Sequence, residues 1–371
     1  MKTKSRETWR EEGDGLLLRV LPVLALVLLI FLFMMRPAGY RSDPPPVSSD
    51  SQGLVVERAP SAPVIREIPP PKANVAADTP VFCLPPAVAW TPMPTPTPAG
   101  GGVLRRIAFA SNRGDGRHYQ LYMMDADGNH LERLTHSQAF DRDPHFSYDG
   151  TQLAFSSNRS GNYEIYVLDL ETRDVKRLTR GGGDKSNPFW SPDNHHVLFT
   201  WHRGGTSELG IMRADGTHMR MLTDQEGDSH GYGFSPDGRY ISYESTVNDR
   251  NEIFLYDLES RRSELLLETD DVSYRGDPVF SPVGDKLVFS SDVIARKLRQ
   301  LYIYDIQWDR YYRVTDDAQD KDDPIFSPDG SKIAYVARWE NAWNVYVMDA
   351  DGRHARNVTR SYYDHVVPTW R

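Results

Sequence analysis

The sequence is poor in cysteine. Its single cysteine, Cys83, excludes an intramolecular disulfide and any metal site built from several cysteines. Cys83 lies far beyond the apolar segment near the N-terminus and lacks the small-residue context of a lipoprotein acylation site. We therefore expect a free thiol, with an intermolecular disulfide as the alternative.

An excess of basic residues is also missing. The 371-residue chain holds 43 Lys and Arg against 52 Asp and Glu, a formal net charge of −9. Residues 1–102 contain ten of the basic and nine of the acidic residues, so residues 103–371 hold 33 basic and 43 acidic residues. Because a phosphate backbone is bound by clustered Lys and Arg, nucleic acid is not an expected partner.

Motifs for catalysis and metal binding are not evident. An α/β-hydrolase needs a Gly-x-Ser-x-Gly nucleophile elbow within a catalytic domain, and we expect neither, because no residues remain beyond the repeats described below to build that domain. Residues 125–128 and 349–352 have the sequence Asp-Ala-Asp-Gly but lack the later Glu of an EF-hand calcium loop, so they are expected to be turns. The eleven His residues show no His-x-x-x-His spacing. We predict no catalytic residues, no cofactor and no metal.

One long apolar run is present near the N-terminus. Residues 16–35 are apolar apart from Arg19 and Pro22, and as a helix of about 30 Å they would span a bilayer. Four basic residues precede the run, which favours a cytoplasmic N-terminus. We predict a cytoplasmic tail over residues 1–15 and a transmembrane signal-anchor helix over residues 16–35. A cleaved signal peptide is the alternative, but the stretch after the run offers no pair of small residues at the cleavage positions.

A segment rich in proline and threonine follows, over residues 36–102. It contains Pro44–Pro46, Pro69–Pro71 and alternating prolines at 92–98. Because proline lacks an amide donor and fixes φ, such a stretch stays solvated and favours polyproline II. We predict a disordered extracytoplasmic linker that carries a globular head.

The head, residues 103–371, repeats one pattern six times. Its clearest marker is a tight turn between two apolar runs, typically Ser-Pro-Asp-Gly, at 147–150, 191–194, 235–238, 281–284 and 327–330. Proline suits the second position of a type I turn, and Gly or Asn tolerates a left-handed conformation at the last position. The Asp of the turn therefore needs no functional role. Runs of β-branched and aromatic residues around these turns predict four strands per repeat, as in a propeller blade.

The two ends of the head complement each other. The first repeat begins directly at its second strand, residues 107–109, whereas the chain ends at 366–371 with residues that match the innermost strand of other repeats, such as 143–146. We predict an all-β fold, a six-bladed β-propeller in which the C-terminal strand supplies the innermost strand of the first blade. Closure of this kind removes exposed strand edges.

The motifs of this repeat resemble those of a known family. Pro-x-Phe/Trp-Ser-Pro-Asp-Gly, then Ile-Ala-Phe-x-Ser-Asn-Arg, then Ile-Tyr-x-Met-Asp-x-Asp-Gly and Leu-Thr are similar to the WD40-like repeat of the TolB family. Only the fourth repeat departs clearly, in its last strand, residues 264–267. The resemblance implies a TolB-type propeller. It does not extend to the α/β domain that precedes the propeller in that family, nor to the envelope complex to which TolB belongs.

Acidic residues collect in the loops that lead into the innermost strands, where we place the candidate partner-binding face. Its residues are Asp143, Asp184, Asp228, His230, Asp277, Asp320, Asp323, Asp364 and His365. The loops after the second strands share this face and supply Arg113, Arg159 and Arg203. Two roles stay open: the arginines pair with loop carboxylates and brace neighbouring blades, or the acidic ring binds a cation, a basic peptide or a sugar.

These features predict a non-catalytic interaction module, tethered to the cell membrane by one N-terminal helix with the propeller outside the cytoplasm. The partner would be an unknown protein or another component of the cell envelope. The alternative is an enzyme, a lyase or hydrolase that uses acidic channel residues with a divalent cation. An enzyme needs carboxylates and a His that converge on one point, whereas a ring of acidic residues favours binding.

Overall fold

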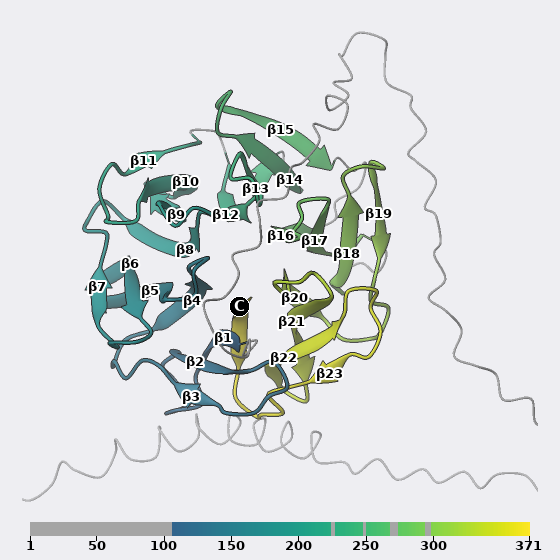
Figure 1. Cartoon of the computed structure of the whole chain (residues 1–371), viewed down its shortest axis with the longest axis horizontal. Coiled ribbons are helices and arrows are strands. Elements are labelled where there is room, and N and C mark those ends of the chain that lie inside the picture. The colour runs from purple at the N-terminus through teal and green to yellow at the C-terminus, as the bar shows by residue number, and fades with distance from the viewer. Residues whose placement is uncertain (1–105, 224–226, 248–249, 268–273, 294–297) are drawn as a thin grey trace, which may run out of the picture. The chain divides into compact units, whose positions relative to one another are not determined.

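The computed structural model describes residues 106–371, except for residues 224–226, 248–249, 268–273 and 294–297. In this part of the chain, twenty-four strands form six four-stranded antiparallel sheets. The sheets stand around a central axis (Figure 1), so the predicted all-β six-bladed propeller is confirmed. The predicted tail, anchor helix and linker, residues 1–102, lie outside the described residues. Among the residues that are described, no helix has the length and apolarity to cross a membrane.

Each blade is built from four strands. Blade 1 contains β1 (Arg106–Ser111), β2 (Gln120–Asp125), β3 (Glu132–Arg133) and β24 (His365–Trp370), and blade 2 contains β4 (Asp141–Phe146), β5 (Gln152–Ser160), β6 (Asn162–Asp169) and β7 (Val175–Arg177). Blade 3 contains β8 (Asp184–Trp190), β9 (His196–Arg203), β10 (Thr206–Arg213) and β11 (Arg220–Met221), and blade 4 contains β12 (Ser229–Phe234), β13 (Tyr240–Val247), β14 (Arg250–Asp257) and β15 (Arg262–Leu267). Blade 5 contains β16 (Arg275–Phe280), β17 (Lys286–Ser291), β18 (Gln300–Asp305) and β19 (Arg310–Arg313), and blade 6 contains β20 (Lys321–Phe326), β21 (Lys332–Trp339), β22 (Ala342–Asp349) and β23 (Arg356–Asn357).

The C-terminal strand closes the ring. Strand order in blade 1 is β24-β1-β2-β3, and Ile107 lies opposite Trp370 while Ser111 lies opposite His365. Beyond the sheet, the backbones of Arg106 and Arg371 exchange two hydrogen bonds of 2.6 and 2.9 Å. The predicted closure by the last strand is therefore present.

The Ser-Pro-Asp-Gly turns have the predicted chemistry. The amide of Gly150 donates to the carbonyl of Ser147 at 2.9 Å, and Gly150 has a φ of 72°. Asn194, which stands where other blades have Gly, also adopts a left-handed φ, of 58°. Asp149 Oδ1 accepts from Ser147 Oγ at 2.6 Å. The turn aspartate is thus satisfied locally.

The Asp-Ala-Asp-Gly segments are turns, as expected. Asp127 Oδ1 accepts the backbone amide of Asn129 at 3.0 Å, and Asp125 lies 2.5 Å from the imidazole of His130. Asp349 makes the equivalent contact with His354 at 2.6 Å.

Apolar side chains fill the seams between blades. At the seam of blades 6 and 1, for example, Phe109 and Tyr122 pack with Val345, Val347 and Trp370. Equivalent clusters occur at the other five seams. Because the core lies between the blades, the residues nearest the axis are free to be polar.

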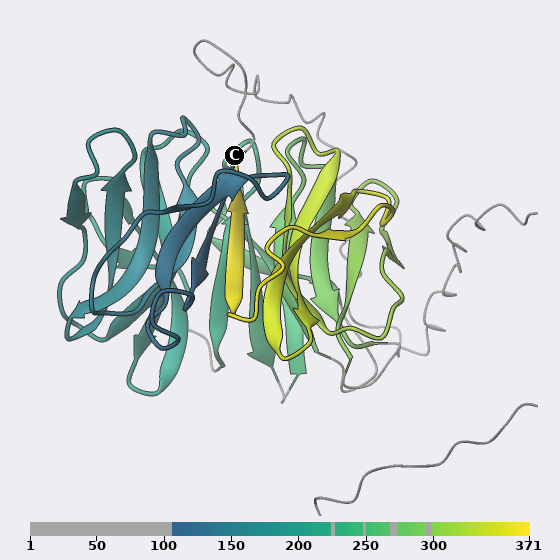
Figure 2. The same cartoon turned by 90° about the horizontal axis from the view of Figure 1, so that it is seen from below.

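The propeller has two distinct faces (Figure 2). We call the face with the loops that lead into the innermost strands, and with the loops between second and third strands, the loop face. The opposite face carries the Ser-Pro-Asp-Gly turns, and we call it the turn face. β24 starts at the loop face with His365 and runs to Arg371, which pairs with Arg106. The polypeptide therefore enters and leaves the propeller on the turn face.

Candidate functional site

The innermost strands of all six blades line a central cavity of about 240 Å³. In five blades the residue before the proline of the strand has a left-handed backbone: Asp143 (φ 52°), Asn187 (53°), Asp277 (56°), Asp323 (49°) and Val367 (51°). Strand pairing slips at the same place. Asp and Asn tolerate this conformation better than most residues. The backbone bulge thus explains why acidic and amide side chains collect around the channel.

Polar groups of these bulges tie one blade to the next. The backbone amide of Asn187 donates to Asp143 Oδ2 at 3.2 Å, and the Asn187 side-chain amide donates to the carbonyl of Gly231 at 2.8 Å. On the other side of the ring, the amide of Val367 donates to Asp323 Oδ2 at 3.0 Å. The channel carboxylates therefore brace the ring as well as line it.

Glu244 supplies the carboxylate that blade 4 lacks at its bulge. This blade has Gly231 where four of the other blades have Asp or Asn, and Glu244 of the adjacent strand β13 is 6% exposed. Tyr232 Oη donates to Glu244 Oε1 at 3.1 Å, and Tyr274 Oη to Oε2 at 3.5 Å. A Cβ at Gly276 would collide with Glu244 Oε2 and Tyr274 Oη, so a larger residue there would have to displace both side chains.

Three more carboxyl groups lie beside Glu244. Ser290 Oγ lies 2.7 Å from Asp277 Oδ2 and 3.2 Å from Asp322 Oδ1, and Asp323 follows in the same strand. Arg299 forms an ion pair with Asp322. We name Glu244, Asp277, Asp322 and Asp323 the acidic cluster.

Burial changes the protonation of this cluster. Burial, with the charge of Asp277 as the second cause, raises the pKa of Glu244 to about 8 and that of Asp323 to about 7. Burial and Asp277 also raise the pKa of Asp322, against the opposing effect of Arg299. The cluster therefore holds protons near neutral pH.

Four predicted loop aspartates share one contact across the seams. Each accepts, through Oδ1, a backbone amide that lies 21 residues earlier, in the preceding blade. The pairs are Asp184 with Tyr163 (2.8 Å), Asp228 with Ser207 (2.8 Å), Asp320 with Arg299 (2.8 Å) and Asp364 with Trp343 (2.9 Å). These bonds brace neighbouring blades, and contact with a partner stays a prediction.

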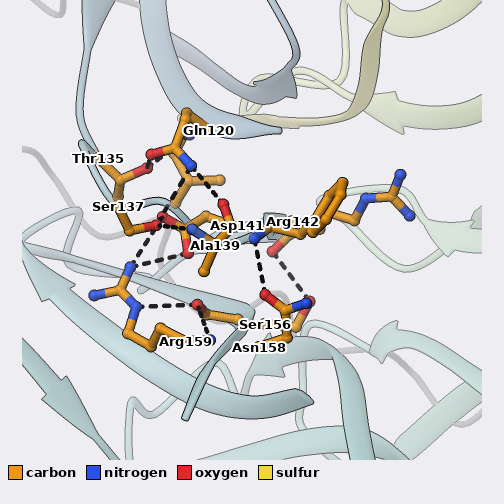
Figure 3. Close-up of polar contacts among 12 residues, drawn as sticks. Gln120, Thr135, Ser137, Ala139, Asp141, Arg142, Ser156, Asn158 and Arg159 are labelled. Carbon is orange, nitrogen blue, oxygen red and sulfur yellow. Dashed lines mark hydrogen bonds and ion pairs between the residues drawn. The ribbon is translucent and has the colours of Figure 1, made fainter. Parts of the chain in front are cut away.

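Of the three predicted arginines, only Arg159 pairs with a carboxylate in the described part of the chain, and this pair lies within one blade. Arg159 pairs with Asp141 of its own blade at 2.9 Å (Figure 3). The Arg113 guanidinium lies 5.7 Å from the centre of the Tyr122 ring, and within the described part of the chain neither Arg113 nor Arg203 pairs with a carboxylate.

Arg299 is the residue that the sequence reasoning missed. It precedes β18 and lies 3.4 Å from Asp320 Oδ2, while its guanidinium lies 5.4 Å from the centre of the Tyr274 ring. No Asn-Arg motif marks it. The one signal for this contact is a spacing: Asp320 lies 21 residues after Arg299, as the other three loop aspartates lie 21 residues after the amides that they accept.

The two predicted histidines differ in access. His230 lines the channel, and burial with the nearby His202 lowers its pKa. His365 is 0% exposed and meets the Phe109 ring edge-on at 5.2 Å, and burial with the charge of Arg113 lowers its pKa to about 3. The expectation that His365 contributes to an accessible face is therefore corrected. The sequence does not reveal that the first position of β24 points into the seam.

The expectation that the sequence lacks a Gly-x-Ser-x-Gly motif is wrong. Residues 227–231, Gly-Asp-Ser-His-Gly, match the Gly-x-Ser-x-Gly pattern that the sequence was not expected to contain. Ser229 begins an innermost strand, is 1% exposed and lies 3.0 Å from Ser245 Oγ. A nucleophile elbow places an exposed serine between a strand and a helix, so this serine is structural. Among the described residues, no three His, Cys, Asp or Glu are arranged to hold a metal.

Solved structures share this fold. The chain is similar to TolB from Acinetobacter baumannii (24% identity, 72% of this chain and 66% of that chain, TM-score 0.65) and to the putative TolB from Agrobacterium tumefaciens (21%, 70% and 89%, 0.57). Hydrazine synthase from Kuenenia stuttgartiensis is also similar (15%, 72% and 47%, 0.60). Each likeness is one of fold, and the chain spans a little under two thirds of the Acinetobacter chain. A search of curated proteins found no match.

The family model described as the TolB beta propeller domain matches residues 91–231, 143–291 and 206–371. Together these matches cover the whole described propeller and the repeat pattern seen in the sequence. The chain therefore belongs to the TolB β-propeller family.

Proposed function

We propose that the propeller is an interaction module that binds a basic segment of a cell-envelope protein on its loop face. One observation carries this proposal: several carboxyl groups gather at the channel, and within the described residues Arg299 is the one guanidinium that pairs with the acidic cluster. Carboxylates around an opening, joined by Asp323 as the pH rises through its pKa of about 7, extend their potential outward and attract opposite charge. Membership of the TolB propeller family supports the same reading.

The direction of the chain supports a tethered arrangement. The polypeptide enters at Arg106 on the turn face, so a membrane tether over residues 16–35 would leave the loop face unobstructed. In this proposal the proline-rich segment, residues 36–102, acts as a spacer outside the cytoplasm. A single-pass protein with a cytoplasmic N-terminus would then present its acidic face away from the membrane.

The test removes charge without disturbing the bulges. Asp143, Asp277 and Asp323 are changed together to Asn, because Asn187 shows that asparagine fits the same left-handed position. The full-length variant and the wild type are immobilised, and bound envelope proteins are compared by mass spectrometry at low and physiological salt. We expect the variant to lose proteins that the wild type retains, mainly through slower, salt-sensitive association.

A matched control carries the same loss of charge elsewhere. Glu171→Gln, Asp174→Asn and Glu264→Gln alter exposed carboxylates of blades 2 and 4, away from the channel. This triple variant is expected to retain the same proteins as the wild type. Equal retention by both triple variants, with unchanged melting temperatures, would reject the proposed face.

The enzymatic alternative is favoured by one feature of the same cluster. A carboxyl whose pKa is about 8, as for Glu244, suits general acid–base catalysis near neutral pH. In that case Glu244→Gln would abolish turnover of a bound substrate while leaving its binding intact. Under the interaction proposal, capture of the partner tolerates this substitution and no turnover depends on it.

A further inference from the structure

A second cavity, of about 360 Å³, lies between the outer strands of blades 1 and 2. We call it the seam groove. Its lining includes Arg133, Arg159 and Arg173 together with Glu132, His136 and Val175. Three guanidinium groups in one groove are unexpected in a head where acidic residues outnumber basic ones.

Two of the three arginines have carboxylate partners. Arg173 pairs with Glu132 at 2.5 Å, at the exposed rim. Arg159 pairs at 2.9 Å with Asp141, which is fully buried. Arg133 donates through Nε to the carbonyl of Thr135 at 2.7 Å, and within the described residues no carboxylate pairs with it. The groove therefore keeps one uncompensated guanidinium.

The next blade shows what neutralises the same position. Arg177 of β7 corresponds to Arg133 of β3, and its Nε likewise donates to the carbonyl of Thr179 at 2.7 Å. Arg177 also donates to Glu164 Oε1 at 3.0 Å. In blade 2 the repeat thus provides both the arginine and its counter-charge.

Blade 1 replaces that counter-charge with an amide. Gln120 faces Ser111 in blade 1 as Glu164 faces Ser157 in blade 2, so the two positions are equivalent. The Gln120 amide donates to the carbonyl of Ala139 at 2.7 Å, and Gln120 Oε1 accepts from Thr135 Oγ1 at 3.2 Å (Figure 3). Gln120 is therefore fully engaged across the seam. Because blade 1 has Gln120 where blade 2 has Glu164, this position carries no negative charge, and the positive charge of Arg133 stays available to a ligand.

We propose that the seam groove binds an oxyanion, the carboxylate or phosphate group of a small polar ligand, with Arg133 as its main contact. A guanidinium offers paired donors that match such groups. Arg173 and the exposed His136 add donors at the rim. The cavity volume suits a ligand of about the size of one sugar ring. This site is opposite in charge to the channel and does not depend on the function proposed for the loop face.

The experiment is calorimetric titration of the full-length protein with inorganic phosphate and, separately, with glucuronate. We expect at least one probe to bind. Arg133→Gln should weaken this binding about tenfold or more, and Arg133→Lys should weaken it less, because lysine keeps the positive charge but lacks the paired donors of the guanidinium. A preference for phosphate or for glucuronate identifies the phosphoryl or the carboxylate source, and either result supports the site. Melting temperatures confirm that the variants fold.

Arg313→Gln is the matched control. Arg313 lies opposite Tyr302 in blade 5 as Arg133 lies opposite Tyr122 in blade 1, and it is outside the seam groove. The substitution removes the same charge and should change probe binding by less than about twofold. Absence of binding of both probes at about 10 mM, or equal weakening by Arg133→Gln and Arg313→Gln, overturns the proposal.

Discussion

At the level of single residues, the surroundings of a carboxyl group decide what it does in this propeller. Asp149 lies in a turn and satisfies a serine hydroxyl, and Asp184 accepts a backbone amide from the neighbouring blade. Glu244 instead lies beside Gly276 of the next blade, where burial and Asp277 raise its pKa to about 8. The same functional group thus closes a turn, joins two blades or stores a proton.

Glu244 predicts how stability depends on pH. Its folded-state pKa lies above the ordinary value of 4.5, so the folded protein favours the protonated form. The stability that this proton provides is complete below about pH 4.5 and is lost as the pH rises through about 8. Glu244→Gln resembles the protonated form. At about pH 9 we therefore expect the variant to be more stable than the wild type, with a free energy of unfolding that is larger by about 1–3 kcal/mol.

Denaturant unfolding at about pH 5 and pH 9 measures this effect, and the two proteins should converge at the lower pH. Glu171→Gln serves as the control, because Glu171 is exposed and lies in a turn of blade 2. Parallel stability curves for Glu244→Gln and the wild type would contradict the assignment of a retained proton.

At the level of strands, the seam of blades 6 and 1 depends on the end of the chain. β24 pairs with β1 and buries Trp370, which is 6% exposed, in the apolar cluster of this seam. Its first residue, His365, is buried against Phe109. The blade therefore has no innermost strand without these residues.

Deletion of residues 366–371 should reopen the ring. We expect a loss of several kcal/mol from a total free energy of unfolding of roughly 5–15 kcal/mol. Trp370→Ala is a milder version, with an expected loss of about 3–5 kcal/mol. Thermal and denaturant melts report both. Trp308→Ala is the control, because Trp308 is 63% exposed and should shift stability by less than about 0.5 kcal/mol. Unchanged cooperative melting of the truncated chain would show that closure does not depend on β24.

At the level of the whole molecule, the polypeptide enters the propeller on one face, and the aspartates that join neighbouring blades lie at the other. Arg106 and Arg371 are paired on the turn face, whereas Asp184, Asp320 and Asp364 lie in loops of the opposite face. The N-terminal tether proposed above would leave the loop face free.

The predicted tether can be tested by fractionation. We expect the full-length protein to stay with membranes after washing in alkaline carbonate, and a variant that lacks residues 16–35 to be released. Protease added from outside should cut within residues 36–102, because solvated proline-rich chain is accessible, and should free the intact propeller. A mature N-terminus located beyond Met35 would show instead that the segment is a cleaved signal peptide.

Much of the fold could be predicted from the sequence because it is repetitive and local. Turns such as Ser235–Gly238 follow from the backbone preferences of Pro, Asp and Gly, and alternating apolar runs around them predict four strands. The unmatched ends of the head, residues 107–109 and 366–371, predict closure because one blade lacks a strand that the C-terminus supplies. These inferences need only residues that are close in the chain or a count of repeats.

The contacts of the site were decided by the tertiary structure. Arg299 meets Asp320 and Asp322, and Glu244 meets Tyr274, only because neighbouring blades pack side by side. Likewise, Arg133 lacks the counter-charge that Arg177 has, which becomes visible once the seams are compared. A repeat pattern determines which positions point to a seam or to the channel. The burial and partners that set the charge of each residue depend on residues from another blade, and only the closed ring brings them together.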